Sequence, residues 1–325
     1  MEQVRLGGSG LHVSRVCLGM MTYGSSAWRP WVLDEAAAAP IVRAAVEAGI
    51  TFFDTADIYS DGASEVVTGR LLRPLIARDE LVLATKLFNP MTPGPNGRGL
   101  SRKHVLSAID ASLARLELDY VDLYQIHRFD PLTPVEETME ALHDVVQSGK
   151  ARYIGASSMF AWQFAKMQNA AERNGWTRFV SMQNHYNLVY REEEREMIPL
   201  CHDQGVGILP WSPLARGLLA GKRTRAGERA SVRAETDAFQ DELYGRAEDF
   251  DVAEAVEKVA AERGVAPAQV ALAWLLSRPA VVPIVGASRA GHVEDARAAT
   301  ELTLTAAEIA RLEAPYRPNS VRGHV

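Results

Sequence analysis

The chain has 325 residues, of which 47% are hydrophobic and 23% charged, proportions ordinary for a soluble globular enzyme. No apolar run reaches the ~18 residues that a membrane-spanning helix needs, so we expect no membrane span. The formal net charge is −6 and no basic tract occurs, which argues against a nucleic-acid partner and favours small-molecule chemistry. Two cysteines and an N-terminus without an apolar signal core predict a protein of the reducing cytoplasm.

The N-terminal segment is expected to form a short hairpin. Residues 4–13 alternate around a glycine-rich turn and lead into a first strand over residues 14–19. These glycines do not form a dinucleotide-binding fingerprint, because the third glycine of that pattern would fall on Val13. The glycines are therefore read as turn residues.

Strands and helices are then predicted to alternate to the end of the chain. The expected strands cover residues 14–19, 50–54, 81–86, 120–126, 152–156, 179–183, 205–211 and 280–286. The expected helices cover residues 33–49, 64–74, 101–116, 133–149, 160–174, 192–204, 252–263, 267–276, 292–299 and 305–312. Eight alternations without an internal repeat predict an α/β fold, a (β/α)8 TIM barrel, formed by residues 1–325 as a single domain.

Two helix starts carry capping signals, and one connection is unusually long. Thr133 is expected to cap its helix, with Pro134 in the first turn and Glu136 returning to the cap. Thr305 and Glu308 form a second capping box. The long polar insertion after the seventh strand, residues 220–250, is weakly periodic, and connections of this length are usually functional or disordered.

Chemically complementary side chains stand at neighbouring strand ends. Asp54, Lys86 and His127 end the second, third and fourth expected strands, and Tyr59 lies on the loop after Asp54. Parallel neighbours in one barrel would bring all four groups to its carboxyl-end face, where such barrels carry their active sites. Taken singly, each residue is more often structural than functional. The combination favours an active site.

The sequence resembles the aldo-keto reductases along nearly its whole length. The segments that carry the resemblance are 49–69, 84–86, 99–127, 155–158, 210–217 and 285–289. The long insertion and the segment 127–131 are more similar to the bacterial reductases and potassium-channel β subunits than to the aldose-reductase branch. The resemblance implies a barrel that binds NADPH across its carboxyl-end face and reduces aldehydes or ketones.

Carbonyl reduction needs a hydride for carbon and a proton for oxygen. By its place in the resemblance, Tyr59 is expected to be the proton donor. Lys86 is the ammonium that stabilises its phenolate, and Asp54 positions and balances Lys86. A neutral His127 would donate a hydrogen bond to the substrate oxygen.

The resemblance also assigns a cofactor site. Trp211 offers a ring for the nicotinamide, and Ser157 and Gln183 would bond its carboxamide. The phosphates and adenosine would contact the loops after the last two strands and the helix that follows: Ser212, Pro213, Leu214, Arg216, Gly217, Gly286, Ser288, Arg289, His292 and Asp295. Arg289 is expected to favour NADPH over NADH, because a guanidinium can bind the extra phosphate.

The sequence departs from the family pattern at three places. Ser158 follows Ser157 where relatives often carry Asn or Arg, so the nicotinamide contacts are expected to differ. His292, Asp295 and Ala296 replace the residues around the adenine in channel-type relatives. The first loop carries Met20 and Met21 where relatives often have a small residue and an aromatic one. The candidate substrate contacts are the histidine at the fourth strand end and four further side chains of the carboxyl-end loops: Met21, Tyr23, Phe88, His127 and Phe129.

Two other functions remain compatible with the sequence. A lysine at a barrel strand end is also the nucleophile of Schiff-base aldolases, which would give that role to Lys86. The channel relatives imply a nucleotide-sensing accessory subunit. The expected partner is a small-molecule carbonyl substrate, no metal ligand set is assigned, and a homo-oligomer is compatible with the chain.

Overall fold

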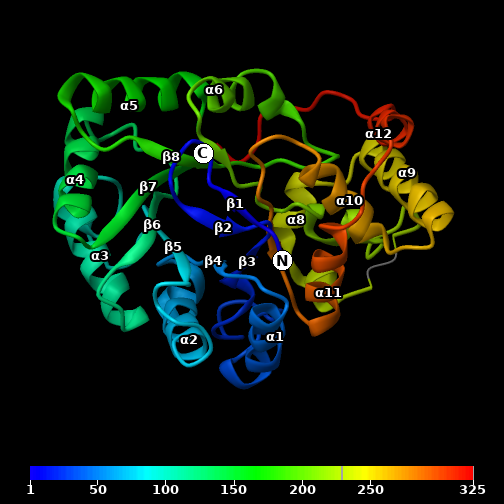
Figure 1. The fold of residues 1–325 in the computed structure, drawn as a ribbon, viewed down its shortest axis with the longest axis horizontal. Coiled ribbons are helices and arrows are strands. Elements are labelled where there is room, and N and C mark those ends of the chain that lie inside the picture. Colours follow the sequence, from blue (N-terminus) through cyan, green and yellow to red (C-terminus); the bar gives the residue numbers. More distant parts are fainter. Residues whose placement is uncertain (228–229, 325) are drawn as a thin grey trace.

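The computed structural model describes residues 1–227 and 230–324, and its centre is an eight-stranded parallel sheet (Figure 1). The strands are β3 (Cys17–Gly19), β4 (Phe52–Asp54), β5 (Val82–Leu87), β6 (Val121–Ile126), β7 (Ala151–Ser157), β8 (Phe179–Gln183), β9 (Gly207–Ile208) and β10 (Ile284–Gly286). Their order is β10-β3-β4-β5-β6-β7-β8-β9. A bridge between Ile208 and Val281 joins the two ends of the sheet. The predicted (β/α)8 barrel is confirmed.

Helices surround the sheet and bury its outer side chains (Figure 1). The helices after the first six strands are α1 (Glu35–Glu47), α2 (Ala63–Leu72), α3 (Arg102–Leu116), α4 (Val135–Gln147), α5 (Ala161–Asn174) and α6 (Met197–Asp203). The C-terminal part contains α7 (Val232–Thr236), α8 (Ala238–Leu243), α9 (Ala247–Arg263), α10 (Pro267–Leu276), α11 (Ala290–Ala299) and α12 (Ala306–Glu313). The capping box of Thr305 and Glu308 at α12 is present as expected.

The predicted N-terminal hairpin is formed by β1 (Gln3–Arg5) and β2 (His12–Ser14). Its apolar residues Leu6 and Val13 pack in one buried cluster with inward-facing strand residues such as Phe52 and Val82. Gly7 has a φ of +57°, and a Cβ there would lie 2.4 Å from the backbone nitrogen of Gly207. The glycine-rich turn therefore lets the hairpin contact β9 directly.

Three predicted elements and one predicted helix cap are corrected. The strands over 205–211 and 280–286 are shorter than expected, because Pro210 and Pro283 have no N–H to donate to a ladder. The helix over 192–204 is interrupted between a 3-10 turn (Glu192–Glu194) and α6. Thr133 does not cap α4: its hydroxyl donates to Asp130 at 2.7 Å, and Pro134 occupies the capping position without a side-chain hydrogen bond.

The insertion over 220–250 is more helical than its weak periodicity indicated. It contains α7 and α8, and α9 begins at Ala247 instead of residue 252. The Asp249 carboxylate accepts hydrogen bonds from the backbone nitrogens of Gly245 and Arg246 at 2.9 and 3.0 Å, which starts α9 early. Residues 228 and 229 of the insertion lie outside the described residues.

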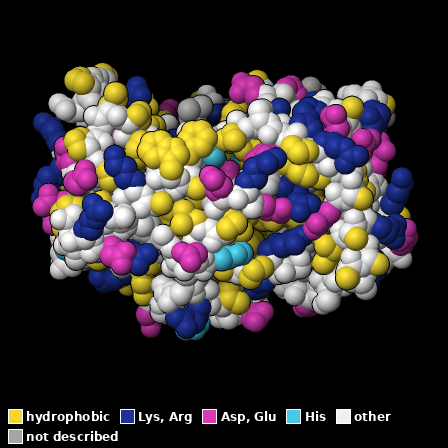
Figure 2. Space-filling model, turned by 90° about the horizontal axis from the view of Figure 1, so that it is seen from above, with side chains coloured by type: hydrophobic (Ala, Val, Ile, Leu, Met, Phe, Trp, Pro, Cys, Tyr) yellow, Lys and Arg dark blue, Asp and Glu magenta, His cyan; other side chains and the backbone are white. Residues whose placement is uncertain are grey.

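The surface carries both signs of charge. On the face shown in Figure 2, basic and acidic side chains are interspersed among neutral and hydrophobic ones. Over residues 1–227 and 230–324, no helix combines the length and apolar character that a bilayer crossing requires.

Candidate active site

A cavity of about 900 Å³ opens at the carboxyl ends of the strands. Its lining includes a residue at or just after the end of each barrel strand: Gly19, Asp54, Asn89, His127, Ser157, Gln183, Trp211 and Gly286. Small-molecule sites usually enclose about 300–1,000 Å³, so this cavity is large enough for an extended ligand.

Lys86, Asp54 and Tyr59 meet at the floor of this cavity. In the register of β4 and β5, Asp54 lies beside Ala84, so Lys86 is two residues further along and on the same inward face. The Lys86 Nζ donates to Asp54 Oδ2 at 2.6 Å, to the Thr55 carbonyl at 2.8 Å and to the Tyr59 hydroxyl at 3.3 Å. Neighbouring parallel strand ends therefore bring three of the predicted groups together.

Asp54 is held on both carboxylate oxygens. Its Oδ1 accepts hydrogen bonds from the side-chain amides of Gln125 and Gln183, each at 2.9 Å, and its Oδ2 accepts from Lys86. Only 2% of Asp54 is exposed. A buried carboxylate with hydrogen bonds to both oxygens is held in one orientation.

Lys86 is charged and enclosed. Burial by itself would lower its pKa, but the charge of Asp54, with Tyr59 and hydrogen bonds to both, outweighs burial, and the pKa of Lys86 is raised. Its relative exposure is 0%, and the residue does not line the cavity. Tyr59 does line the cavity, so its hydroxyl separates Lys86 from a bound ligand.

His127 lies across the cavity floor from Tyr59, with ring centroids 5.9 Å apart and planes at 83°. Its pKa is lowered well below the usual value, first by burial and then by the charges of Lys86 and Arg128, so the ring is neutral. The Asn89 side-chain nitrogen lies 3.2 Å from Nδ1. An amide nitrogen only donates, so Nδ1 accepts and the proton of His127 is on Nε2.

Trp211 is the outer member of a ring stack. His185 lies parallel to it at 4.2 Å between centroids, and Tyr190 lies on the other side of His185 at 4.0 Å. The indole Nε1 donates to the Ser158 hydroxyl at 2.9 Å. Ser158, the departure from the family pattern, thus orients the Trp211 ring.

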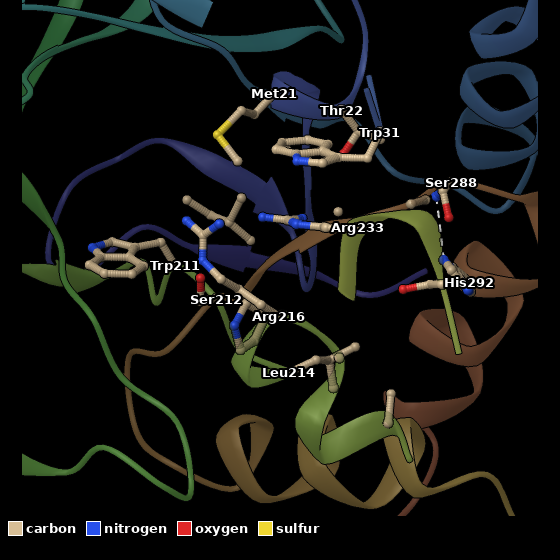
Figure 3. A pocket seen from close by; sticks show the side chains of 18 of the residues that line it. Met21, Thr22, Trp31, Trp211, Ser212, Leu214, Arg216, Arg233, Ser288 and His292 are labelled. Carbon is tan, nitrogen blue, oxygen red and sulfur yellow. Dashed lines mark hydrogen bonds between the residues drawn. The ribbon is translucent and has the colours of Figure 1, made fainter. Parts of the chain in front are cut away.

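One side of the cavity carries arginines that gather around Asp237 of the insertion. Asp237, at the start of α8, is fully buried and forms ion pairs with Arg216, with Arg233 at 3.1 Å and with Arg29 at 3.7 Å. In the view of Figure 3, the guanidinium groups of Arg216 and Arg233 lie between Trp211 and the Ser288–His292 pair.

All thirteen residues predicted to bind the cofactor line the cavity. Some of their polar atoms have partners within the protein. The Ser157 hydroxyl donates to the Gln183 carbonyl at 2.8 Å, and the Gln183 amide nitrogen donates to Asp54. Asp295 accepts from Gln269 at 2.8 Å. Ser157 and Gln183 therefore line the cavity and also connect, through hydrogen bonds, to Asp54.

The predicted substrate contacts are less well reproduced. Met21 and His127 line the cavity, whereas Tyr23, Phe88 and Phe129 do not. Tyr23 is fully buried, and Phe129 packs edge-on against Trp162. The cavity instead receives side chains that the sequence interpretation missed: Trp28, Arg29, Trp31, Asn89 and Arg128. Two signals were present: an aromatic pair after the first strand, and polar residues shortly after the strand ends at Lys86 and His127.

Among the described residues, no group of three or more His, Cys, Asp or Glu side chains is arranged to hold a metal ion. A (β/α)8 barrel with a deep cavity at the carboxyl ends of its strands places the protein in the class of barrel enzymes. The chain belongs to the aldo/keto reductase family, whose family model matches residues 15–317. It is an oxidoreductase of that family.

Curated relatives match the chain over nearly their full length. It is 48% identical to versiconal hemiacetal acetate reductase of Aspergillus parasiticus, covering 99% of this chain and 98% of the relative. Aldo-keto reductase AMT2 of Alternaria alternata is 46% identical over 98% of this chain and 93% of its own length. A putative aryl-alcohol dehydrogenase of Schizosaccharomyces pombe is 44% identical over 98% and 97%.

Proposed function

We propose that the protein uses NADPH to reduce aldehydes or ketones to alcohols, with Tyr59 as the proton donor. The observation that carries this proposal is the hydrogen bond of 3.3 Å from Lys86 to the Tyr59 hydroxyl at the cavity floor. An ammonium at that position stabilises the phenolate that remains after proton donation. Membership of the aldo/keto reductase family supports the same chemistry.

The residues of the cavity fit a nicotinamide dinucleotide. Trp211 presents a ring held by Ser158 and His185, which suits a stacked nicotinamide. Lys222 and Arg289 both line the cavity beside His292, and their charges lower the pKa of that histidine after burial does. Two cations at that end suit phosphate groups. When bound, the nicotinamide supplies the hydride that the carbonyl carbon receives.

The side chains of this protein would then manage the substrate oxygen. His127, neutral and protonated on Nε2, donates a hydrogen bond that orients the carbonyl. Tyr59 transfers its hydroxyl proton to the developing alkoxide, so that the alcohol forms and a tyrosinate remains. Lys86, fixed by Asp54, stabilises that tyrosinate.

Tyr59→Phe tests the proposal. The ring remains and only the transferable proton is lost, so we expect kcat for 4-nitrobenzaldehyde to fall by at least about a hundredfold. Dissociation constants for NADPH, measured by fluorescence, should stay within a few-fold of the wild-type value. Retention of full turnover in the variant would exclude Tyr59 as the donor.

Two observations weigh against the Schiff-base alternative. Lys86 is outside the cavity lining, and its raised pKa keeps it protonated, whereas a Schiff-base lysine must be a free amine within reach of the carbonyl. Borohydride trapping of a carbonyl compound on Lys86, with no NADPH binding, would support the aldolase. NADPH binding without turnover of any aldehyde or ketone would support a nucleotide-sensing subunit.

We further propose that the chain is one domain acting on a small carbonyl compound in the reducing cytoplasm, without a nucleic-acid partner. Cys17 and Cys201 are both free and buried, which suits such a compartment. Size-exclusion chromatography with light scattering would distinguish a monomer from a homo-oligomer.

A further inference from the structure

Arg128 is a cation at the catalytic end of the cavity. It follows His127 directly and lines the cavity beside it. Its Nη1 donates to the His127 carbonyl at 2.5 Å. Its charge acts on both Tyr59 and His127. Within residues 1–227 and 230–324, no carboxylate forms an ion pair with this guanidinium, and it has no second hydrogen-bond acceptor.

The other cations of the cavity have different positions or partners. Arg29, Arg216 and Arg233 share the carboxylate of Asp237. Lys222 and Arg289 act on His292, on the helix that follows the last strand. These two suit the phosphates of the cofactor. Arg128 is therefore the cation that faces the substrate end without a carboxylate of the protein.

Aromatic rings border the same end of the cavity. Trp28 lies 6.4 Å from the Tyr59 ring and 6.4 Å from Trp31, measured between centroids. Both indoles line the cavity. This wall accepts a flat apolar ring by stacking or edge contact, while a half-buried guanidinium without a carboxylate favours an anion.

We infer that Arg128 binds an anionic group of the substrate, and that the preferred substrates are aromatic aldehydes or ketones carrying a carboxylate. This inference rests on the proposed reductase function and names its substrate class. The planar guanidinium can donate two parallel hydrogen bonds to a carboxylate. A neutral ester of the same shape cannot form the charged pair, so it should be discriminated against by roughly ten- to a hundredfold in kcat/KM.

The test compares matched substrates with NADPH: 3- and 4-formylbenzoate against their methyl esters. The wild-type enzyme should favour at least one acid over its ester by about tenfold or more. Arg128→Met should remove that preference by slowing the acid while the ester keeps its kcat/KM within about threefold. Arg128→Lys, which keeps the charge but not the planar fork, should give an intermediate ratio.

Arg102→Met is the control, because it removes a guanidinium that is paired with Asp144 and does not line the cavity. Its acid-to-ester ratio should equal that of the wild type. An acid-to-ester ratio that Arg128→Met leaves unchanged would overturn the inference. Equal losses for acid and ester would also overturn it, because they would assign Arg128 to the fold or to the catalytic group.

Binding of isophthalate and terephthalate, measured by calorimetry, separates this inference from the proposed function. Weaker binding by at least about tenfold in Arg128→Met supports the anion site even in an enzyme preparation without NADPH-dependent turnover. Absence of turnover with every carbonyl compound would contradict only the reductase function. Binding that is independent of Arg128 would contradict the anion site, whatever the turnover.

Discussion

Lys86 and Asp54 compensate each other's charge in the barrel interior. Neither side chain is appreciably exposed, and their atoms lie 2.6 Å apart. Removing one partner of such a pair leaves the other charge buried and uncompensated, which costs about 3–5 kcal/mol. The pair proposed to act in catalysis therefore also contributes to the stability of the fold.

We predict that Lys86→Met lowers the free energy of unfolding by about 3 kcal/mol or more and abolishes most turnover. The double variant Lys86→Met/Asp54→Asn should recover much of that stability, because no charge remains buried, but not the turnover. Urea denaturation and steady-state kinetics check the two parts. Wild-type rates across pH in Lys86→Met would contradict the coupling of Lys86 to Tyr59.

Arg289 is exposed at the rim of the cavity and forms no ion pair within the described residues. A guanidinium in this position can bind the additional phosphate of NADPH, which NADH lacks. We predict that Arg289→Ala weakens NADPH binding by at least about tenfold, makes it less dependent on salt and leaves NADH binding almost unchanged.

Fluorescence titrations with both cofactors at two salt concentrations test this prediction. Arg297→Ala is the control, because Arg297 lies on the same helix but is paired with Glu294 and Glu301. It should change neither affinity. Equal losses for NADPH and NADH in Arg289→Ala would assign Arg289 to the fold or to the shared pyrophosphate.

The insertion, which contains α7 and α8, is held against the loop after β3 by contacts with Arg29 and Trp31. Asp237 attracts Arg29 of that loop, while Arg233 of α7 also stacks on Trp31 with 4.3 Å from the guanidinium carbon to the ring centroid. The insertion thus forms a cover over the cavity, and Asp237 supplies the negative charge that three arginines share. Without that charge the arginines would repel one another.

We predict that Asp237→Asn loosens this cover. NADPH should dissociate at least about tenfold faster in stopped-flow measurements, and limited proteolysis should cut residues 220–250 sooner. Saturating NADPH should slow cleavage in the wild type. Glu242→Gln, an exposed change on α8, is the control and should behave like the wild type. Cleavage that NADPH does not slow would count against a cover that closes on the cofactor.

For the whole molecule, one buried carboxyl makes stability depend on pH. Asp57 is fully buried, and burial, followed by the charge of Glu65, raises its pKa to about 7. Its Oδ2 has no hydrogen-bond partner in the described part of the chain. The folded protein therefore binds this proton more tightly than the unfolded chain. The stabilisation is fully present below the unfolded pKa of about 4 and is lost as pH rises to about 7.

We predict that the free energy of unfolding of Asp57→Asn, taken relative to that of the wild type, increases by about 3 kcal/mol when the pH is raised from 4 to 8. Urea denaturation at both pH values gives the difference. Asp61→Asn, an exposed change on the same loop, should show no such dependence. If the free energies of unfolding of wild type and variant differ by the same amount at both pH values, Asp57 has the same pKa in the folded and unfolded states, which contradicts the prediction.

The sequence by itself determined the barrel and the convergence of Asp54, Lys86 and His127 at one end of it. Apolar runs that end in Asp54, Lys86 and His127 must bring these residues to one face once the strands are parallel neighbours, because register and alternation leave little freedom. Local signals also sufficed for α10 and β8, whose observed bounds match the expected ones.

Only the tertiary structure decided where the loop side chains point. Phe88 has a φ of +150°, a backbone conformation that its sequence does not signal, and Asn89 lines the cavity where Phe88 does not. The insertion lies against the loop after β3 because Asp237 forms an ion pair with Arg29, which is more than 200 positions away in the chain. Strand periodicity is a local property of the sequence, whereas the direction of a loop side chain depends on backbone angles and partners that only the folded chain provides.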